Sequence, residues 1–390
     1  MLLQRARRIF ALMTFMFWSS LYVYLPVLGP QAERLGAPLS LVGLIISSYG
    51  FAQLWLRIPL GIWSDRLGRR KPFIMLAFVI AAISGFGLWS AEDARQMLVY
   101  RGLGGVAAST WVVFTVLFCS YFPPDKGSQA IGLITATTFS AEMASTLTGG
   151  FLAEKYGWRA PFFCSGLLAL VGLALSAMVK EEPQPQSTIS IVEMASVGKN
   201  KRLLSVSIIG ALSQYVVFVT LYGFTPVYAA RLGATAMQLG FLSATAFVAM
   251  AAASLVGGAF WAEKFGEVRV VIGGLLVVSC CSVLIPFINE LRLLYAIQAL
   301  SGFGRGLILP ALMSMSIQGV PDARKGTAMG FFQAIYSLGM FGGPALSGMM
   351  SELLGLRGIF FCAGGVGLIT ALATQHLLQS PMEAGIEEWI

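Results

Sequence analysis

Charge is scarce in this sequence. Asp, Glu, Lys and Arg make up 11% of its 390 residues, whereas 57% are hydrophobic and the mean hydropathy is +0.78. A soluble chain of this length carries about a quarter charged residues. Too few polar side chains are therefore present to cover a water-exposed surface, and most of the chain must be surrounded by lipid.

Residues that usually carry catalysis or bind metals are also few. The chain has one histidine, His376, and five cysteines, which lie in or beside apolar runs without the spacing of a metal cluster or a disulfide framework. No phosphate-binding glycine loop or catalytic triad is visible in the sequence. These absences predict that the protein is no enzyme, holds no cofactor, and draws its energy from a gradient.

The sequence is instead rich in apolar runs of about 20 residues, the length that crosses a bilayer as a helix. Twelve such runs, each bounded by charged or turn residues, predict an all-α membrane protein with twelve transmembrane helices. They cover residues 9–29, 40–62, 73–91, 96–119, 128–153, 160–179, 203–229, 237–260, 270–288, 293–317, 327–351 and 358–378.

The loops between these runs differ in positive charge. With the N-terminus inside, 16 of the 26 Lys and Arg residues fall on the cytoplasmic side and 7 on the outer side, while Arg57, Arg101 and Arg305 lie within spans. Loops rich in Lys and Arg stay in the cytoplasm, so both termini are expected there, in a cell (inner) membrane protein. The same asymmetry explains the net charge of +8 without a nucleic-acid partner.

Short segments recur at nearly one period along the chain. WRAPFFC at 158–164 and LRGIFFC at 356–362 are 198 residues apart, and four further pairs have offsets of 197 to 200. These are LYVYLPV and LYGFTPV (21–27, 221–227), RLGAP and RLGAT (34–38, 231–235), QAIG and TAMG (129–132, 327–330), and STLTGG and GPALSG (145–150, 343–348). The repeat predicts two six-span halves, 1–180 and 203–390, joined by a cytoplasmic loop at 181–202. Parallel halves of this kind are typical of transporters.

The connection between the second and third spans reads GIWSDRLGRRKP. It resembles the signature loop of the major facilitator superfamily, matching at Gly61, Asp65, Arg66, Gly68, Arg69 and Arg70. A decayed copy in the second half, AFWAEKFG, retains Glu263 and Gly266. The resemblance covers essentially the whole chain. It implies two pseudo-symmetric six-helix bundles with spans 1, 4, 7 and 10 around a central cavity. It also implies a secondary active transporter of a small molecule, working as a functional monomer.

The signature loop has a physical interpretation as a gate. We expect Gly61 to let span 2 approach a neighbouring helix closely. Asp65 lies at a helix C-terminus, which is already negative, so its carboxylate is expected to cap a helix of the other half. The resemblance implies that this partner is span 11, beginning near Gly326, and that the contact favours the outward-facing state. The arginines of the loop can bridge acids or lipid phosphates, although the positive-inside rule alone accounts for Arg70 and Lys71.

Glu142 is the only carboxylate inside any predicted span, and such groups are costly and usually functional. Thr146 and Gly149 follow it at i+4 and i+7, on the same helix face. The functional interpretation is a proton carrier or a counter-charge for a cationic substrate. The alternative is a fixed ion pair with Arg305 or Arg101, which would keep the carboxylate ionised and prevent proton carriage.

Arg305 lies in the middle of span 10, with Ser301 and Gln298 at i−4 and i−7 on one polar stripe. Because a guanidinium can hold two carboxylate oxygens in a fixed fork, Arg305 is a candidate anion anchor. Arg101, nearer the outer end of span 4, is a second candidate. Arg57, close to the cytoplasmic end of span 2, can instead extend to the membrane interface.

Aromatic residues recur on the first span of each half. Trp18 and Tyr22 lie on span 1, Tyr215 and Tyr222 lie on span 7, and Tyr22 and Tyr222 are partners in the repeat. They are candidates for a cavity wall that suits an amphipathic organic substrate. Packing or lipid contact is the alternative for each of them.

Three functions fit these features. The first is alternating-access efflux of a small organic compound across the cytoplasmic membrane, driven by protons or another coupling ion. The second is uptake or exchange of a small organic anion centred on Arg305 and Arg101. The third is a membrane protein that does not transport, such as a lipid scramblase or a receptor. The signature loop, the duplication and Glu142 favour the first, in a protein that contacts membrane lipid throughout.

Overall fold

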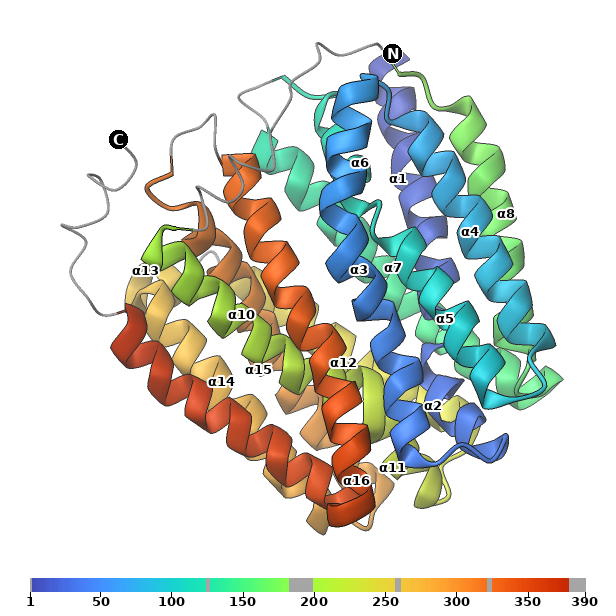
Figure 1. Cartoon of the computed structure of the whole chain (residues 1–390), viewed down its shortest axis with the longest axis vertical. Coiled ribbons are helices and arrows are strands. Elements are labelled where there is room, and N and C mark those ends of the chain that lie inside the picture. The colour runs from blue at the N-terminus through green and yellow to red at the C-terminus, as the bar shows by residue number, and fades with distance from the viewer. Residues whose placement is uncertain (1, 124–126, 182–198, 257–260, 321–324, 379–390) are drawn as a thin grey trace. The chain divides into compact units, whose positions relative to one another are not determined.

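The computed structural model describes residues 2–123, 127–181, 199–256, 261–320 and 325–378, and every regular element within these ranges is a helix (Figure 1). Within the described residues, ten helical segments are long and apolar enough to cross a membrane. The prediction of an all-α membrane protein is confirmed. The exact number of twelve spans stays a prediction.

The chain divides into two compact units. Unit 1 comprises Met1–Thr188 with Gly233–Ala244, and unit 2 comprises Ile189–Leu232 with Thr245–Ile390. The helices of unit 1 are α1 (Leu2–Tyr22), α2 (Leu25–Arg34), α3 (Leu39–Leu67), α4 (Lys71–Ser90), α5 (Ala94–Ala108), α6 (Trp111–Cys119), α7 (Gly127–Tyr156) and α8 (Ala160–Met178). Most of the predicted central loop, 181–202, lies outside the described residues, so the expected halves stay a prediction.

Unit 2 contains α10 (Lys201–Val219), the π-helix η2 (Thr220–Phe224), α11 (Thr225–Arg231), α13 (Ala262–Phe265), α14 (Glu267–Leu284), the 3₁₀-helix η4 (Ile285–Phe287), α15 (Leu291–Ile317) and α16 (Lys325–Leu378). Helix α12 (Ala236–Val256) begins in unit 1 and ends in unit 2.

Several predicted spans are interrupted helices. Span 1 is formed by α1 and α2, with Val23 and Tyr24 between them, and span 7 is formed by α10, η2 and α11. Span 4 likewise consists of α5 and α6. Spans 11 and 12 both lie within α16, as two helices joined across a kink at Gly355, whose dihedral angles are not helical. The apolar pattern does not mark these interruptions. Two of them are followed directly by a proline, Pro26 in α2 and Pro226 in α11, which has no backbone N–H to donate to the preceding turn.

Glycines with positive φ repeat with the period of the sequence. Gly36 and Gly233, Gly68 and Gly266, and Gly157 and Gly355 form three pairs separated by 197 or 198 residues, with φ between 63° and 94°. Only glycine adopts this conformation readily. The repeat thus extends to the backbone, and Gly355, which has non-helical dihedral angles inside α16, corresponds to the turn at Gly157 between α7 and α8.

Close helix contacts repeat in the same way. A Cβ added to Gly105 would overlap the carbonyl oxygen of Tyr49, and a Cβ added to Gly302 would overlap the carbonyl oxygen of Ala246. Both pairs join the fourth span of a half to its second span, 197 residues apart. Small residues permit such close packing of membrane helices, where no hydrophobic force drives their association.

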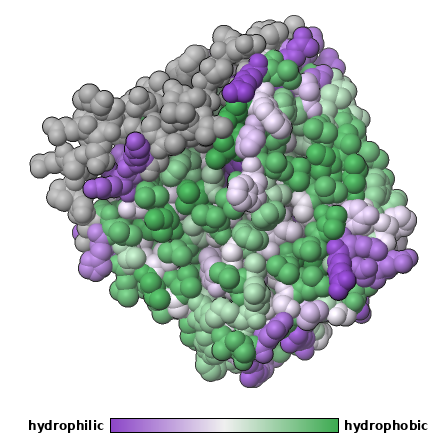
Figure 2. Space-filling view, viewed as in Figure 1, coloured by the Kyte–Doolittle hydropathy of each residue, from purple (hydrophilic) through white to green (hydrophobic). Residues whose placement is uncertain are grey.

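Large apolar side chains face outward along the helices. Trp55, Val99, Leu170 and Val171 are exposed in unit 1, and Figure 2 shows hydrophobic residues over much of the viewed face with hydrophilic residues gathered toward helix ends. Such a surface suits lipid, since each helix satisfies its own backbone hydrogen bonds.

The turn at Gly355 provides a test of the fold. At φ 67° and ψ 177°, Gly355→Ala should lower the free energy of unfolding by about 1–3 kcal/mol, the cost of a side chain in this region. The control is Gly342→Ala in the same helix, where a Cβ would meet open space. That change should be neutral, or stabilising by about 0.5–1 kcal/mol. Thermal unfolding in detergent measures both, and equal midpoints would contradict the assignment of the turn.

Candidate functional site

The signature loop begins where α3 ends. Gly68 follows the last helical residue, Leu67, with φ 63°, so glycine is required at this position to reverse the chain. Gly266, in the second copy of the motif, also has a positive φ, 83°, directly after α13. The side chains of Asp65 and Glu263 lie outside the described residues, so the predicted cap on span 11 stays a prediction. A Cβ at Gly61 would meet no atom within 4 Å. The close approach expected at Gly61 is therefore not found in the described part of the chain.

Glu181 holds the other end of the signature loop. Its carboxylate accepts hydrogen bonds from the backbone N–H groups of Arg70 and Lys71, the latter at 3.0 Å, where α4 begins. Lys71 Nζ in return donates to the carbonyl oxygens of Ala177 and Val179, at 2.7 and 2.9 Å, where α8 ends. An acid caps one helix N-terminus and a lysine caps one C-terminus, both in the favourable sense of the helix dipole.

This exchange corrects the sequence interpretation of Arg70 and Lys71. The positive-inside rule describes their charge, but their backbone positions are fixed by Glu181, and the Arg70 side chain is buried. Sequence reasoning missed Glu181. The available signal was an acidic pair, Glu181 and Glu182, directly after the sixth span.

Tyr121 joins the same region to the N-terminal segment. Its hydroxyl donates to the carbonyl oxygen of Lys180 at 2.5 Å, and its own carbonyl oxygen accepts from Arg7 Nη2 at 2.6 Å. Burial, together with the nearby charge of Glu181, raises the pKa of Tyr121 to about 12. The phenol therefore remains protonated and a donor throughout the physiological range.

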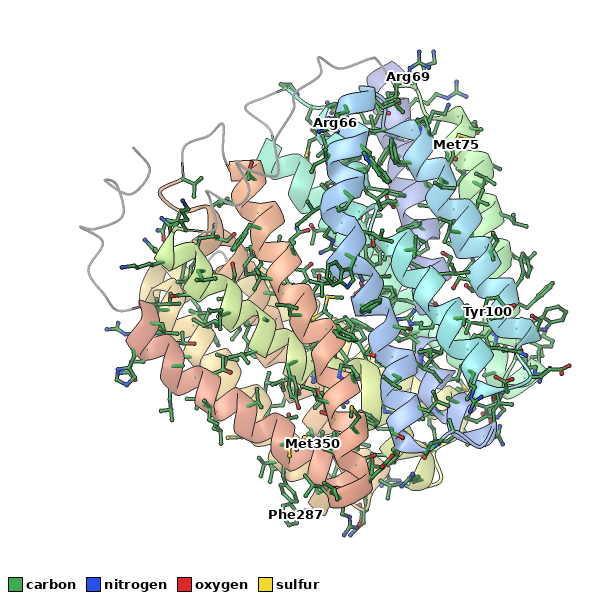
Figure 3. The ribbon with its side chains drawn as sticks, viewed as in Figure 1. Arg66, Arg69, Met75, Tyr100, Phe287 and Met350 are labelled. Carbon is green, nitrogen blue, oxygen red and sulfur yellow. The ribbon has the colours of Figure 1, made fainter. Side chains whose placement is uncertain are left out.

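The remaining arginines of the loop are exposed. Arg66 and Arg69 lie at the end of unit 1 that carries the N-terminus, whereas Tyr100 lies toward the other end (Figure 3). Arg66 lines a shallow pocket with Trp63, Leu67 and Phe73. A cation beside exposed aromatic and aliphatic side chains is typical of the membrane interface.

Glu142 is the centre of a buried polar cluster in unit 1. It is 4% exposed, and the Tyr22 side chain forms a hydrogen bond with its carboxylate. Among the described residues its Oε2 has no hydrogen-bond partner. An acid in this position therefore has a neutral partner and one free acceptor.

Arg101 is held by aromatic side chains rather than by Glu142. It is 3% exposed, its Nη1 donates to the Tyr24 hydroxyl at 2.7 Å, and its guanidinium carbon lies 4.2 Å from the centroid of the Tyr49 ring. No ion pair joins Arg101 to Glu142 in the part of unit 1 that is described. The ring faces stabilise the cation through their quadrupoles, so Glu142 is left without this counter-charge.

Arg57 is also buried, and it does not extend to the interface. Its Nη2 donates to Gln53 Oε1 at 2.6 Å, one turn earlier on α3. Arg57, Arg101 and Glu142 all act electrostatically on the buried Tyr49 hydroxyl. The alternative in which Arg57 reaches the membrane surface is therefore wrong in this structure.

An aromatic surface adjoins Glu142. The Trp18 ring lies 5.6 Å from that of Tyr22 and 5.1 Å from that of Trp111, and Trp18 Nε1 has no hydrogen-bond partner among the described residues. The two predicted residues of span 1 therefore lie together. Trp111, at the start of α6, was missed, because nothing in the apolar run of span 4 distinguishes a cavity residue from a packing residue.

Arg305 has a comparable setting in unit 2. It is 3% exposed, and its Nη2 donates to Thr220 Oγ1 at the start of η2. Its Nε and Nη1 have no partner in the described part of the chain. Tyr222 and Cys281 lie within electrostatic range. A π-helix inside an α-helix is often found at functional sites.

Of the other candidates of unit 2, two polar residues lie on the helix of Arg305, and two tyrosines contact other side chains. Gln298 and Ser301 are buried on the same helix as Arg305, and Gln298 Oε1 has no partner among the described residues. Tyr222 packs against Phe218, with ring centroids 4.7 Å apart. Tyr215 is instead hydrogen-bonded to Ser347 of α16 at 3.0 Å.

Comparison with known proteins bears on the whole chain. A family model described as Major Facilitator Superfamily matches residues 10–259 and 206–384. An uncharacterised MFS-type transporter of Methanocaldococcus jannaschii is 25% identical over 355 residues, covering 86% of this chain and 88% of that protein. The multidrug resistance protein MdtG of Salmonella arizonae is 22% identical over 379 residues, covering 94% and 93%.

Solved structures agree on the fold. A bacterial homologue of the human lysosomal transporter Spinster superposes with a TM-score of 0.81 at 18% identity, over 97% of this chain and 99% of that chain. At this identity the likeness concerns architecture alone. Together with the family match over most of the sequence, it shows that this chain is a membrane transporter that belongs to the major facilitator superfamily.

Proposed function

We propose that this transporter exports an amphipathic organic cation in exchange for protons, with Glu142 as the shared binding group. The observation that carries the proposal is the state of Glu142, which is buried, has a free Oε2, and is hydrogen-bonded to Tyr22 rather than paired with an arginine of unit 1. Ionisable groups at this depth are rare and usually functional.

The neutral partner supports proton exchange. A carboxylate paired with a guanidinium can take up a proton only when a buried ion pair is broken, which is strongly unfavourable. A carboxylate bound by a tyrosine hydroxyl loses no ion pair on protonation. Glu142 can therefore alternate between a proton and a cationic substrate, and this competition is the simplest form of antiport.

The surroundings of Glu142 support an aromatic or aliphatic cation as substrate. The rings of Trp18, Tyr22 and Trp111 form a contiguous surface beside the carboxylate, and such faces attract cations and apolar groups alike. Efflux as the direction is supported by relatives named as multidrug resistance proteins, at 22% identity over nearly the whole chain.

The remaining features of the proposal follow from the sequence. We infer a bacterial-type inner membrane location with both termini in the cytoplasm, from the distribution of Lys and Arg. We also infer a functional monomer that alternates access between its two repeats, with the signature loop as its cytoplasmic gate.

A second candidate function is transport of an organic anion. It is favoured by Arg305, whose Nε and Nη1 have no partner among the described residues although the side chain is buried. Arg101 adds a second buried cation, compensated only by tyrosines. A carboxylate substrate would supply the missing negative charge in a bidentate contact.

Ligand-induced thermal stabilisation tests the cation proposal. Tetraphenylphosphonium should raise the unfolding temperature of the purified protein more at pH 8 than at pH 6, because protons compete for Glu142. At a hundred times Kd the stabilisation is roughly 2.7 kcal/mol. Glu142→Gln should abolish both the stabilisation and its pH dependence.

The matched control for this experiment is Glu154→Gln, which removes an exposed acid three turns later on the same helix. It should respond to tetraphenylphosphonium as the natural protein does. If tetraphenylphosphonium stabilised the Glu142→Gln variant as much as the natural protein, the carboxylate would not bind the cation and the proposal would be wrong.

The anion candidate predicts stabilisation by an anion that depends on Arg305. If transport centres on Arg305, salicylate should stabilise the natural protein, and Arg305→Ala should remove roughly the same 2.7 kcal/mol at a hundred times Kd. Arg292→Ala, at the exposed start of the same helix, should leave the response intact. Stabilisation by salicylate that survives Arg305→Ala would exclude this site.

A further inference from the structure

The break in span 1 is held by side chains and backbone from three other helices. Helix α1 ends at Tyr22 and α2 begins at Leu25, so Val23 and Tyr24 link the two. The Val23 N–H still donates to the Ser19 carbonyl oxygen at 3.0 Å. Each of the three consecutive residues from Tyr22 to Tyr24 then meets a different feature of unit 1.

Two of these contacts come from one face of α7. The Tyr22 side chain is hydrogen-bonded to Glu142, and a Cβ added to Gly149 would overlap the Val23 carbonyl oxygen. Glu142 and Gly149 are seven residues apart, which places them two turns apart on the same side of the helix. Helix α7 therefore supports the break at a backbone contact and at a hydrogen bond to its acid.

The third contact is the anchor on Tyr24. This residue is fully buried, its hydroxyl accepts a hydrogen bond from Arg101 Nη1 at 2.7 Å, and its ring packs on Phe162 of α8 at 5.3 Å. None of these partners changes charge at any physiological pH, since arginine stays protonated. The Tyr24 end of the break is thus fixed, whereas the Tyr22 end is bound to a group that can change its charge.

The described residues of the second half show no corresponding ionisable contact. Its corresponding interruption is η2, where Arg305 donates to Thr220. Through the 198-residue period, the position of Glu142 is occupied by Met340, which is buried. In both halves the first span is therefore interrupted beside a buried arginine, but among the described residues only the first half joins the interruption to an acid.

We propose that the break from Tyr22 to Tyr24 transmits the charge of Glu142 to the outer part of span 1, with Tyr22 as the coupling residue and Arg101 and Gly149 as positioning residues. The proposal rests on the proposed function in one respect, namely that Glu142 exchanges protons. An ionised carboxylate forms a hydrogen bond roughly twice as strong as a neutral one. Protonation therefore weakens the hold on Tyr22 while Tyr24 stays anchored, so that α1 pivots at this point relative to α2.

Hydrogen–deuterium exchange of the full-length protein in lipid nanodiscs, at constant pH, tests the coupling of Glu142 to the break through Tyr22. Glu142→Gln imitates the neutral acid and should speed exchange in peptides covering residues 19–28 roughly three- to tenfold, the factor expected for one weakened hydrogen bond. Tyr22→Phe should have the same effect. Adding Glu142→Gln to Tyr22→Phe should change nothing further, because both act through one contact.

Three control variants separate coupling from loss of structure. Glu154→Gln removes an exposed acid from the same helix and should leave exchange at 19–28 unchanged. Tyr24→Phe removes the anchor from Arg101 and should speed exchange independently, so that its effect adds to that of Glu142→Gln. Among the described residues, the titratable group that interacts electrostatically with Glu142, besides Tyr22 on α1, is Tyr49 on α3, and Tyr49→Phe should leave the response to Glu142→Gln intact.

The outcomes distinguish this coupling from the proposed function. The coupling would be contradicted if Glu142→Gln left exchange at 19–28 unchanged, whatever ligand the protein binds. It would also be contradicted if the effects of Glu142→Gln and Tyr22→Phe were additive. If Glu142→Gln speeds exchange at 19–28 but tetraphenylphosphonium does not stabilise the natural protein, the coupling stands and the cation substrate is rejected.

Discussion

Lipid cannot satisfy a polar group, and the rest of this structure depends on that constraint. Continuous helices satisfy their own backbone, so the informative places are those where a helix is interrupted or a charge is buried. At two places in the described chain the two coincide. The interruption at Val23 and Tyr24 lies beside Arg101, and the π-helix that starts at Thr220 lies beside Arg305. Each buried guanidinium finds a hydroxyl acceptor where the first span of its half departs from α-helical geometry.

Duplication explains why these arrangements resemble one another, and divergence explains why they differ. The glycine turns recur at the repeat period because their positive φ favours glycine. The close contacts at Gly105 and Gly302 recur because a Cβ there would overlap a backbone carbonyl. Side chains facing the polar interior are less constrained by packing. Glu142 in the first half corresponds to Met340 in the second. The scaffold is therefore repeated, whereas among the described residues a buried acid is found in the first half alone.

The sequence was sufficient for features that depend on local pattern. Apolar runs located the spans, the period located the repeat, and the signature motif identified the family. Glu142 and Arg305 were recognised because a charge is conspicuous within an apolar run. Contacts between distant segments could not be read in this way. The cap from Glu181 on α4 joins residues 110 and 111 positions apart, and Tyr24, a tyrosine in an apolar run, gave no sign that it would bind Arg101.

The pairing of charges is where pattern alone was least informative, and it decides what Glu142 can do. A buried acid and a buried arginine in one bundle would ordinarily be expected to neutralise each other, and an ion pair of that kind resists change because breaking it leaves two charges in lipid. Here Tyr24 and Tyr49 bind Arg101, so the cation contributes to structure without fixing the charge of the acid. Because Arg101 does not pair with Glu142, the protein keeps a buried cation that only tyrosine side chains compensate. In return, no arginine of unit 1 fixes the charge of Glu142 among the described residues, which is the condition that the proposed proton exchange requires.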